Sequence, residues 1–156
     1  MNTLEIIGLL GSVASIGSAI FAAYKARKAK EYSDIYHTTD TKEKLQNVFT
    51  KLEHLQEIMY KLNSSETRGI IKDKELKEYK DIRDKLNSII NLVPSNYNII
   101  ITHLNNMVAK VDSCIQSESV MNSTDLFSFK GNIPVILGEV KKELESLRSN
   151  LTRLQQ

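Results

Sequence analysis

The first thirty residues divide into an apolar segment and a basic segment. The apolar run LEIIGLLGSVASIGSAIFAAY extends from Leu4 to Tyr24, is 21 residues long and contains one charged side chain, Glu5. A helix rises about 1.5 Å per residue, so about 20 apolar residues are needed to cross the hydrocarbon core of a bilayer. The pattern therefore predicts a single transmembrane helix.

Positive charges follow this run on its C-terminal side only. We expect the following residues to anchor the helix at the membrane interface: Tyr24, Lys25, Arg27, Lys28 and Lys30. Lys and Arg accumulate on the cytoplasmic side of a span, and Tyr is enriched at the headgroup level. The sequence therefore predicts a transmembrane helix with a basic cytoplasmic flank at 1–30 and a cytoplasmic helical bundle at 31–156. A cleaved signal peptide is not expected, because its charges would precede the apolar run.

Small residues recur along the predicted span in a heptad pattern. Spacings of 4, 3, 4 and 3 separate Gly8, Ser12, Ser15, Ala19 and Ala22. Such a seam lets two backbones approach closely and favours association of transmembrane helices. Two other interpretations stay open: that these residues reflect only the usual composition of spans, and that this helix is the buried centre of a soluble bundle.

Apolar residues at helical spacing continue after the span. We expect the first helix to end at the polar sequence HTTD (37–40), because Asp40 and Glu43 form a capping-box pattern for a new helix. The apolar stripe of that new helix consists of Leu45, Val48, Leu52, Leu55, Met59 and Leu62. Spacings of three and four are typical of one face of a packed helix.

Two further helices are expected in the middle of the chain. The first runs from about Asp73 to Leu92 and ends before Pro94, which disfavours helical backbone at the preceding residue. The second begins after a cap at Ser95 or Asn96. A short strand at 97–103 is the alternative there, because Ile99 to Ile101 are β-branched.

The C-terminal part consists of a predicted connection at 116–132 and a last helix at 132–156, with Pro134 in its first turn. A connection of this length with apolar residues is often functional. The alternative is that this connection has no binding role and folds back on the bundle as a lid. We name as candidate partner-binding residues Leu126, Phe127, Phe129, Leu137, Leu144 and Leu151. The heptad of the last helix suits either an intermolecular coiled coil or one stripe of the bundle.

Composition favours an all-α protein and argues against several classes of function. Hydrophobic residues make up 41% of the chain and charged residues 26%, with two Pro and no Trp, which is ordinary for a helical globular domain. The net charge of +2 arises from the basic cluster beside the span, so no broad positive surface for duplex nucleic acid is expected. The single cysteine, Cys114, has no partner for an internal disulfide and is expected to be buried.

No sequence motif for catalysis, for a cofactor or for a metal is recognisable. His37, His54 and His103 lie far apart and lack the paired spacing of a zinc site. Gly-rich phosphate loops and nucleophile motifs are missing from the sequence. We therefore predict neither enzyme activity nor a cofactor.

The segment IIGLLGSVASIGSAIFAAYKARKAKE, residues 6–31, resembles the membrane module of short bacterial single-span proteins found in anti-phage defence loci. The resemblance implies a bacterial inner-membrane protein with a single span. It further implies a homo-oligomer in contact with membrane lipid, activated through its bundle by a cytoplasmic protein or a nucleotide second messenger. A second resemblance is to the HeLo-like four-helix bundles that permeabilise membranes, and it implies a first helix that inserts only on activation.

The sequence thus predicts an all-α protein with an N-terminal transmembrane helix followed by a cytoplasmic antiparallel bundle of about four helices. The function that we expect is an oligomeric effector of anti-phage defence that disrupts or permeabilises the inner membrane. The alternatives are a membrane-tethered adaptor or scaffold that binds a partner through the bundle, and a soluble helical regulator with a buried first helix.

Overall fold

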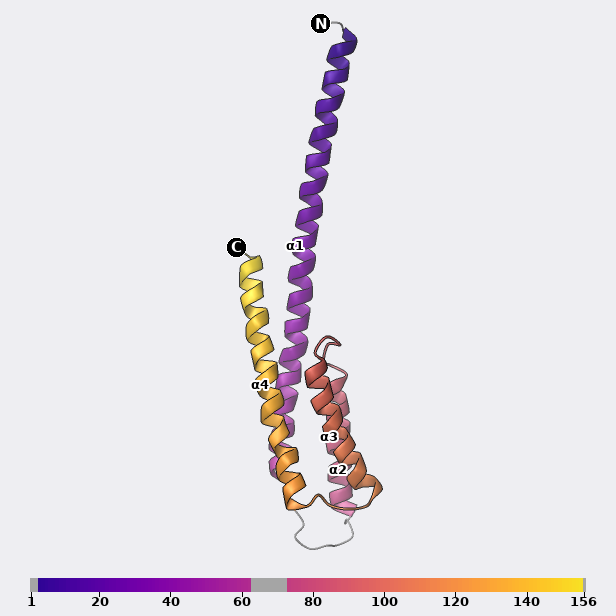
Figure 1. The fold of residues 1–156 in the computed structure, drawn as a ribbon, viewed down its shortest axis with the longest axis vertical. Helices are drawn as coiled ribbons and strands as arrows, with labels where there is room; N and C mark the ends of the chain where they lie inside the picture. Colours follow the sequence, from indigo (N-terminus) through magenta and orange to yellow (C-terminus); the bar gives the residue numbers. More distant parts are fainter. Residues whose placement is uncertain (1–2, 63–72, 156) are drawn as a thin grey trace.

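The protein is all-α over the part of the chain that the structure describes. The computed structural model describes residues 3–62 and 73–155, with side chains at 18–62 and 74–155. This part contains four helices and no strand. They are α1 (Thr3–Tyr60), α2 (Asp73–Ile90), α3 (Asn98–Gln116) and α4 (Ser123–Leu154) (Figure 1). The all-α class is therefore confirmed, and 97–103 lies almost entirely in a helix.

The helices form an up-down-up-down bundle, and one of them is much longer than the bundle itself. Figure 1 shows α1 and α4 side by side and antiparallel, with α2 and α3 as a second antiparallel pair beside them. Short connections between antiparallel neighbours are typical of this topology. The N-terminal half of α1 continues past the ends of the other three helices (Figure 1).

The predicted break at HTTD (37–40) is wrong, because α1 runs through these residues without interruption. The sequence there contains neither Gly nor Pro, and its polar side chains bond along the helix. The Thr38 hydroxyl donates to the Asp34 carbonyl at 2.7 Å, and Asp40 pairs with Lys44 at 2.7 Å instead of capping a new helix. The capping-box pattern is therefore satisfied by ordinary contacts between residues four apart.

The predicted start of the last helix at 132 is also wrong, because α4 begins at Ser123. The Asn122 side chain caps the helix by accepting a hydrogen bond from the Asp125 backbone N–H at 2.7 Å. Pro134 consequently lies inside the helix. An interior Pro costs about 3 kcal/mol, but the earlier start buries Leu126 and Phe129, each worth about 1.5–3 kcal/mol.

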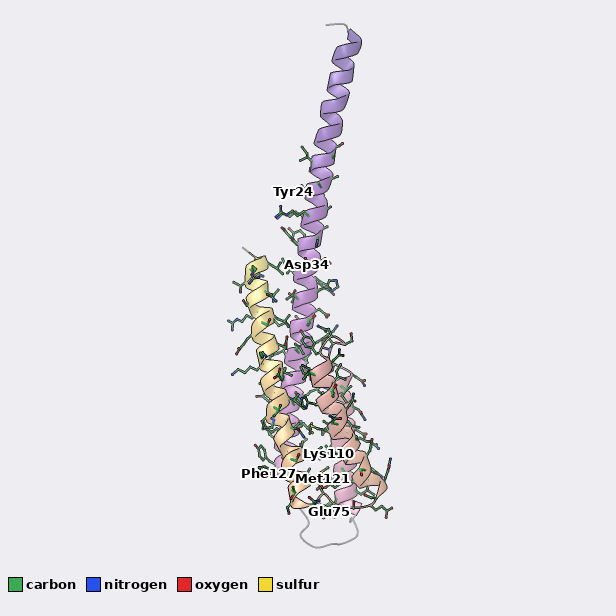
Figure 2. The ribbon with its side chains drawn as sticks, viewed as in Figure 1. Tyr24, Asp34, Glu75, Lys110, Met121 and Phe127 are labelled. Carbon is green, nitrogen blue, oxygen red and sulfur yellow. The ribbon has the colours of Figure 1, made fainter. Side chains whose placement is uncertain are left out.

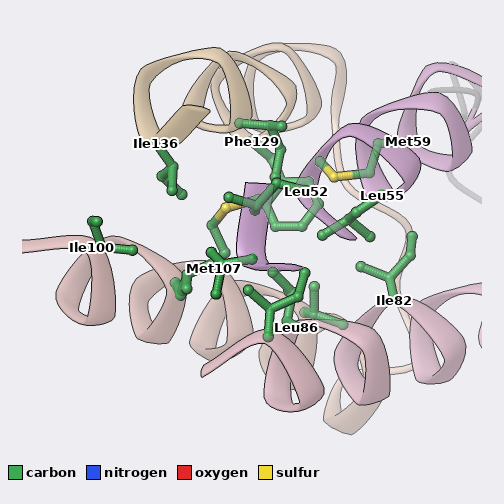
Figure 3. Packing of buried hydrophobic residues seen from close by; sticks show 14 of the residues in the cluster. Leu52, Leu55, Met59, Ile82, Leu86, Ile100, Met107, Phe129 and Ile136 are labelled. Atoms are coloured by element: carbon green, nitrogen blue, oxygen red, sulfur yellow. The ribbon is translucent and has the colours of Figure 1, made fainter. Parts of the chain in front are cut away.

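One apolar core joins all four helices. Every residue of the predicted stripe from Leu45 to Leu62 is buried. Figure 3 shows the middle of this cluster, where side chains from the four helices meet. The other buried hydrophobic residues are Tyr79, Ile82, Leu86, Ile89, Val93, Ile100, Leu104, Met107, Val111, Met121, Leu126, Phe129, Ile133, Ile136 and Val140. The predicted stripe from Leu45 to Leu62 is thus confirmed as a face of the core.

Replacing Tyr79 with Phe is expected to destabilise the bundle by about 1–3 kcal/mol. The buried Tyr79 hydroxyl accepts a hydrogen bond from the Met121 backbone N–H at 3.1 Å, and Phe would leave that N–H unsatisfied. Burial raises the pKa of Tyr79 above its ordinary 10.0, so the stability gained from burying the neutral phenol is fully present below pH 10 and is lost as the pH rises through the raised pKa of the folded state. Urea unfolding measures the change. Tyr60→Phe, at a side chain that is 68% exposed, is the control and should have no effect.

Candidate functional site

The candidate site is the half of α1 that projects from the bundle. All residues from 18 to 30 are exposed, and the first fully buried side chain among the described residues of the helix is Leu45. In Figure 2, Tyr24 lies on the projecting part, beyond the end of α4. The 58 residues of α1 correspond to a length of about 87 Å at about 1.5 Å per residue. The bundle therefore carries a single helix far from its core.

The predicted transmembrane segment falls mainly on residues whose side chains are outside the described part. Among the described residues, no helix has a stretch long and apolar enough to cross a membrane. Gly8, Ser12 and Ser15 of the predicted seam lie at 3–17, where only the helical backbone is described. Ala19 and Ala22 lie within the described part, and both are exposed on the projecting helix.

The basic flank of the predicted span forms a positive and aromatic surface on α1. Arg27 and Lys28 share one carboxylate, Glu31, at 3.8 and 3.9 Å; the Arg27 side chain is largely exposed, and those of Lys28 and Glu31 are about half exposed. Exposed ion pairs of this kind contribute little to stability. Lys25 and Lys30 lie on the same exposed segment. This segment therefore carries four positive side chains and one negative side chain, so its net charge is positive.

Aromatic side chains lie among these charges. Phe21 and Tyr24 are 60% and 58% exposed, and the Lys25 ammonium lies 5.2 Å from the centre of the Phe21 ring. Tyr32 and Tyr36 are also exposed, further along the helix. Of these four aromatic residues, only Tyr24 was predicted from the sequence as an interface anchor. Aromatic rings mixed with Lys and Arg are typical of a helix at a membrane–water interface.

The structure separates the candidate partner-binding residues into three groups. Leu126 and Phe129 are 5% and 0% exposed and belong to the core. Leu137, Leu144 and Leu151 are half-buried on the same side of α4. Phe127 is 82% exposed and points away from the bundle (Figure 2). Of the six residues, Phe127 is therefore the one whose side chain is largely exposed.

A cavity of about 580 Å³ lies between α1 and α2. It is lined by Thr50, Lys51, His54, Asp81, Asp84, Lys85, Ser88 and Ile89. Its polar side chains largely bond one another or their neighbours: Lys51 donates to Ser88 at 3.0 Å, and Lys85 pairs with Asp81 at 3.4 Å. Both positive and negative side chains line the cavity, so its charge indicates no particular class of ligand.

The remaining reactive side chains are isolated from one another in the described part of the chain. No three His, Cys, Asp or Glu side chains lie close enough together there to hold a metal ion. His37 stacks edge-on against Tyr36, and His54 lies 3.8 Å from Glu57. Cys114 is half-buried, and burial raises the pKa of its thiol, which favours the unreactive protonated form.

Comparisons with protein-family models, with curated proteins and with solved structures find no match to this chain.

Proposed function

We propose that the protein is a membrane-anchored oligomeric effector that permeabilises the bacterial inner membrane when its cytoplasmic bundle is activated. The observation that supports this most is the continuity of α1. One helix carries the apolar run Leu4 to Tyr24, the exposed basic flank and the bundle stripe that begins at Leu45, without a break from Thr3 to Tyr60. In this proposal the run Leu4 to Tyr24 crosses the membrane once, with the bundle on the cytoplasmic side.

The positive and aromatic surface of α1 supports the proposed position of the membrane. Anionic headgroups of the cytoplasmic leaflet attract Lys and Arg within about a Debye length. Tyr24 marks the interface, and the roughly 21 residues from there to Leu45 place the core about 30 Å from the bilayer. The exposed residues 18–30 also argue against a first helix sheltered inside its own bundle.

The unbroken helix suggests how activation reaches the membrane. The buried half of α1 packs against α2 and α4, so a partner that repacks the bundle also rotates or shifts the projecting half. The activator in this proposal is a cytoplasmic protein or a nucleotide second messenger. The small-residue seam of the span then brings several copies together, and their association opens the bilayer.

Bulky residues in the seam test the effector function. Gly8→Leu combined with Ser15→Leu should abolish growth arrest and entry of an impermeant dye in bacteria that express the activated protein. Each 1.4 kcal/mol of lost association lowers the association constant about tenfold. The matched control is Leu10→Ile, which keeps the volume of a residue away from the seam.

The alternative function is a membrane-tethered adaptor, which the exposed Phe127 favours. An adaptor binds its partner through the bundle, and the span serves only as a tether. It should therefore tolerate Gly8→Leu and Ser15→Leu without loss of function, and its expression should never admit the dye. Dye entry with the unmodified protein, lost in the double variant, would decide for the effector.

A further inference from the structure

The bundle consists of two antiparallel pairs of helices that are connected at one end. One pair is α1 with α4 and the other is α2 with α3, and the backbones lie closer within each pair than between the pairs. Helices α1 and α3 end, and α2 and α4 begin, at the same end of the bundle, which we call the connected end (Figure 1). The opposite end, which we call the free end, has the turn between α2 and α3. Because that turn lies within one pair, it does not hold the pairs together.

The buried contacts between the two pairs are mostly apolar. One hydrophobic core joins them, and among the described residues no charged side chain is buried. The Lys51 ammonium of α1 donates to the Ser88 hydroxyl of α2 at 3.0 Å, but this bond is exposed. The buried bond from the Met121 backbone N–H to the Tyr79 hydroxyl lies at the connected end (Figure 2). Apolar contacts are non-directional, so they do not fix the two pairs in one relative orientation at the free end.

The cavity of about 580 Å³ interrupts the packing between the pairs. All of its lining residues belong to α1 or to α2, one helix from each pair. Ser88 and Ile89, in the last turn of α2, extend the lining toward the free end. Side chains that border a cavity lack contact partners on one side. The attraction between α1 and α2 is therefore reduced along this part of their interface.

The connection from α3 to α4 contains a residue in an unfavourable backbone conformation. Glu118 has a φ of 45°, in the left-handed region that residues with a Cβ rarely adopt. It belongs to residues 117–122, which join the two pairs at the connected end. Hinges are a few residues of loops or helix ends that absorb a change of φ and ψ. A change of φ at Glu118 would relieve strain, which suits this connection to act as a hinge.

We propose that the α2–α3 hairpin swings away from the α1–α4 pair at the free end, with residues 117–122 as the hinge. Figure 3 shows Ile136 of α4 opposite Ile100 of α3, and Val140 follows Ile136 by one helical turn. Opening uncovers such apolar side chains, so the closed bundle is the major state of the protein alone.

The hinge names the moving part in the activation step, and this use of it rests on the proposed function. An activator that stabilises the open state separates α2 from α1, while α1 stays packed against α4. The projecting half of α1 then continues from a pair of helices in place of a complete bundle. A ligand shifts such an equilibrium only as far as it binds one state better than the other.

Thiol labelling of buried cysteines in the full chain tests the hinge. In a Cys114→Ser background, Val140→Cys lies near the free end and Val111→Cys near the connected end, and both valines are 0% exposed. We expect Val140→Cys to react with a maleimide roughly tenfold faster than Val111→Cys. Equal rates would overturn the proposal, because the core would then be exposed by global unfolding alone. If Val140→Cys lowers the helical content, Val48→Cys, at a 0% exposed site on α1, replaces it.

A covalent bridge between the pairs tests whether the same motion exposes Val140→Cys. Lys51→Cys and Ser88→Cys, at exposed sites, are joined by a short bismaleimide before labelling, which ties α1 to α2. The matched control joins Arg83→Cys to Asp112→Cys within the α2–α3 hairpin, where the native side chains lie 3.7 Å apart. We expect the first bridge to slow labelling roughly tenfold and the control bridge to leave it unchanged. Equal effects of the two bridges would contradict the proposal.

Fractionation of the same samples distinguishes this inference from the proposed function. Membrane-bound protein with equal labelling rates at the two cysteines would reject the hinge and leave the anchor intact. Faster labelling of Val140→Cys in protein recovered from the soluble fraction would support the hinge and reject the anchor.

Discussion

Replacing Phe129 with Ala should cost about 3–5 kcal/mol of unfolding free energy, which is the usual range for a fully buried aromatic residue. Phe129 is 0% exposed and belongs to the cluster that includes Leu52, Leu55 and Met59 of α1 (Figure 3). The total stability of a domain is about 5–15 kcal/mol. The variant should therefore lose a large part of its resistance to urea.

The matched control lies two residues away on the same helix. Phe127→Ala removes the same side chain from a site that is 82% exposed, so unfolding of the monomeric bundle should change by no more than about 0.5 kcal/mol. Urea titration of both variants, at a protein concentration where the bundle is monomeric, makes the comparison. Similar losses in the two variants would show that the assignment of the faces of α4 is wrong.

An arginine in the middle of the apolar run should release the protein from the membrane. On insertion scales an Arg at the centre of a span costs about 2.5–3.5 kcal/mol. Val13→Arg should therefore shift the distribution between the membrane and soluble fractions on the order of a hundredfold. Ser33→Arg makes the same change on the exposed part of α1, beyond the basic flank, and should leave the distribution unchanged.

Both fractions are measured by immunoblotting after separation of the membranes. If Val13→Arg stays in the membrane as firmly as Ser33→Arg, the run Leu4 to Tyr24 is not what holds the protein there.

The spacing of apolar residues predicted most of the helices of the bundle. The sequence patterns taken as helix ends placed two helix boundaries wrongly. The stripe from Leu45 to Leu62 repeats at helical spacing, and each of its residues is buried. The helix boundary predicted at Asp40 is wrong because the residues of a capping pattern are equally compatible with a helix interior, where Asp40 pairs with Lys44. The predicted start of α4 is wrong because Pro134 suggested a first helical turn, whereas the helix begins earlier, at Ser123, and thereby buries Leu126 and Phe129.

The candidate site was predictable only in part, because exposure depends on the phase of a helix. The apolar run and its basic flank are visible in composition alone. Phe127 and Phe129 are equally apolar and lie two residues apart in the sequence. Which of them faces the core depends on where α4 begins and on how it packs.

Membrane association of the intact protein is the most direct test of the central claim that α1 anchors the bundle. Membranes from bacteria that express the chain are washed with alkaline carbonate, and protease is then added from either side. We expect the protein to resist the wash and protease to remove the bundle from the cytoplasmic side only. Recovery in the soluble fraction, or cleavage of the bundle from the opposite side, would contradict it.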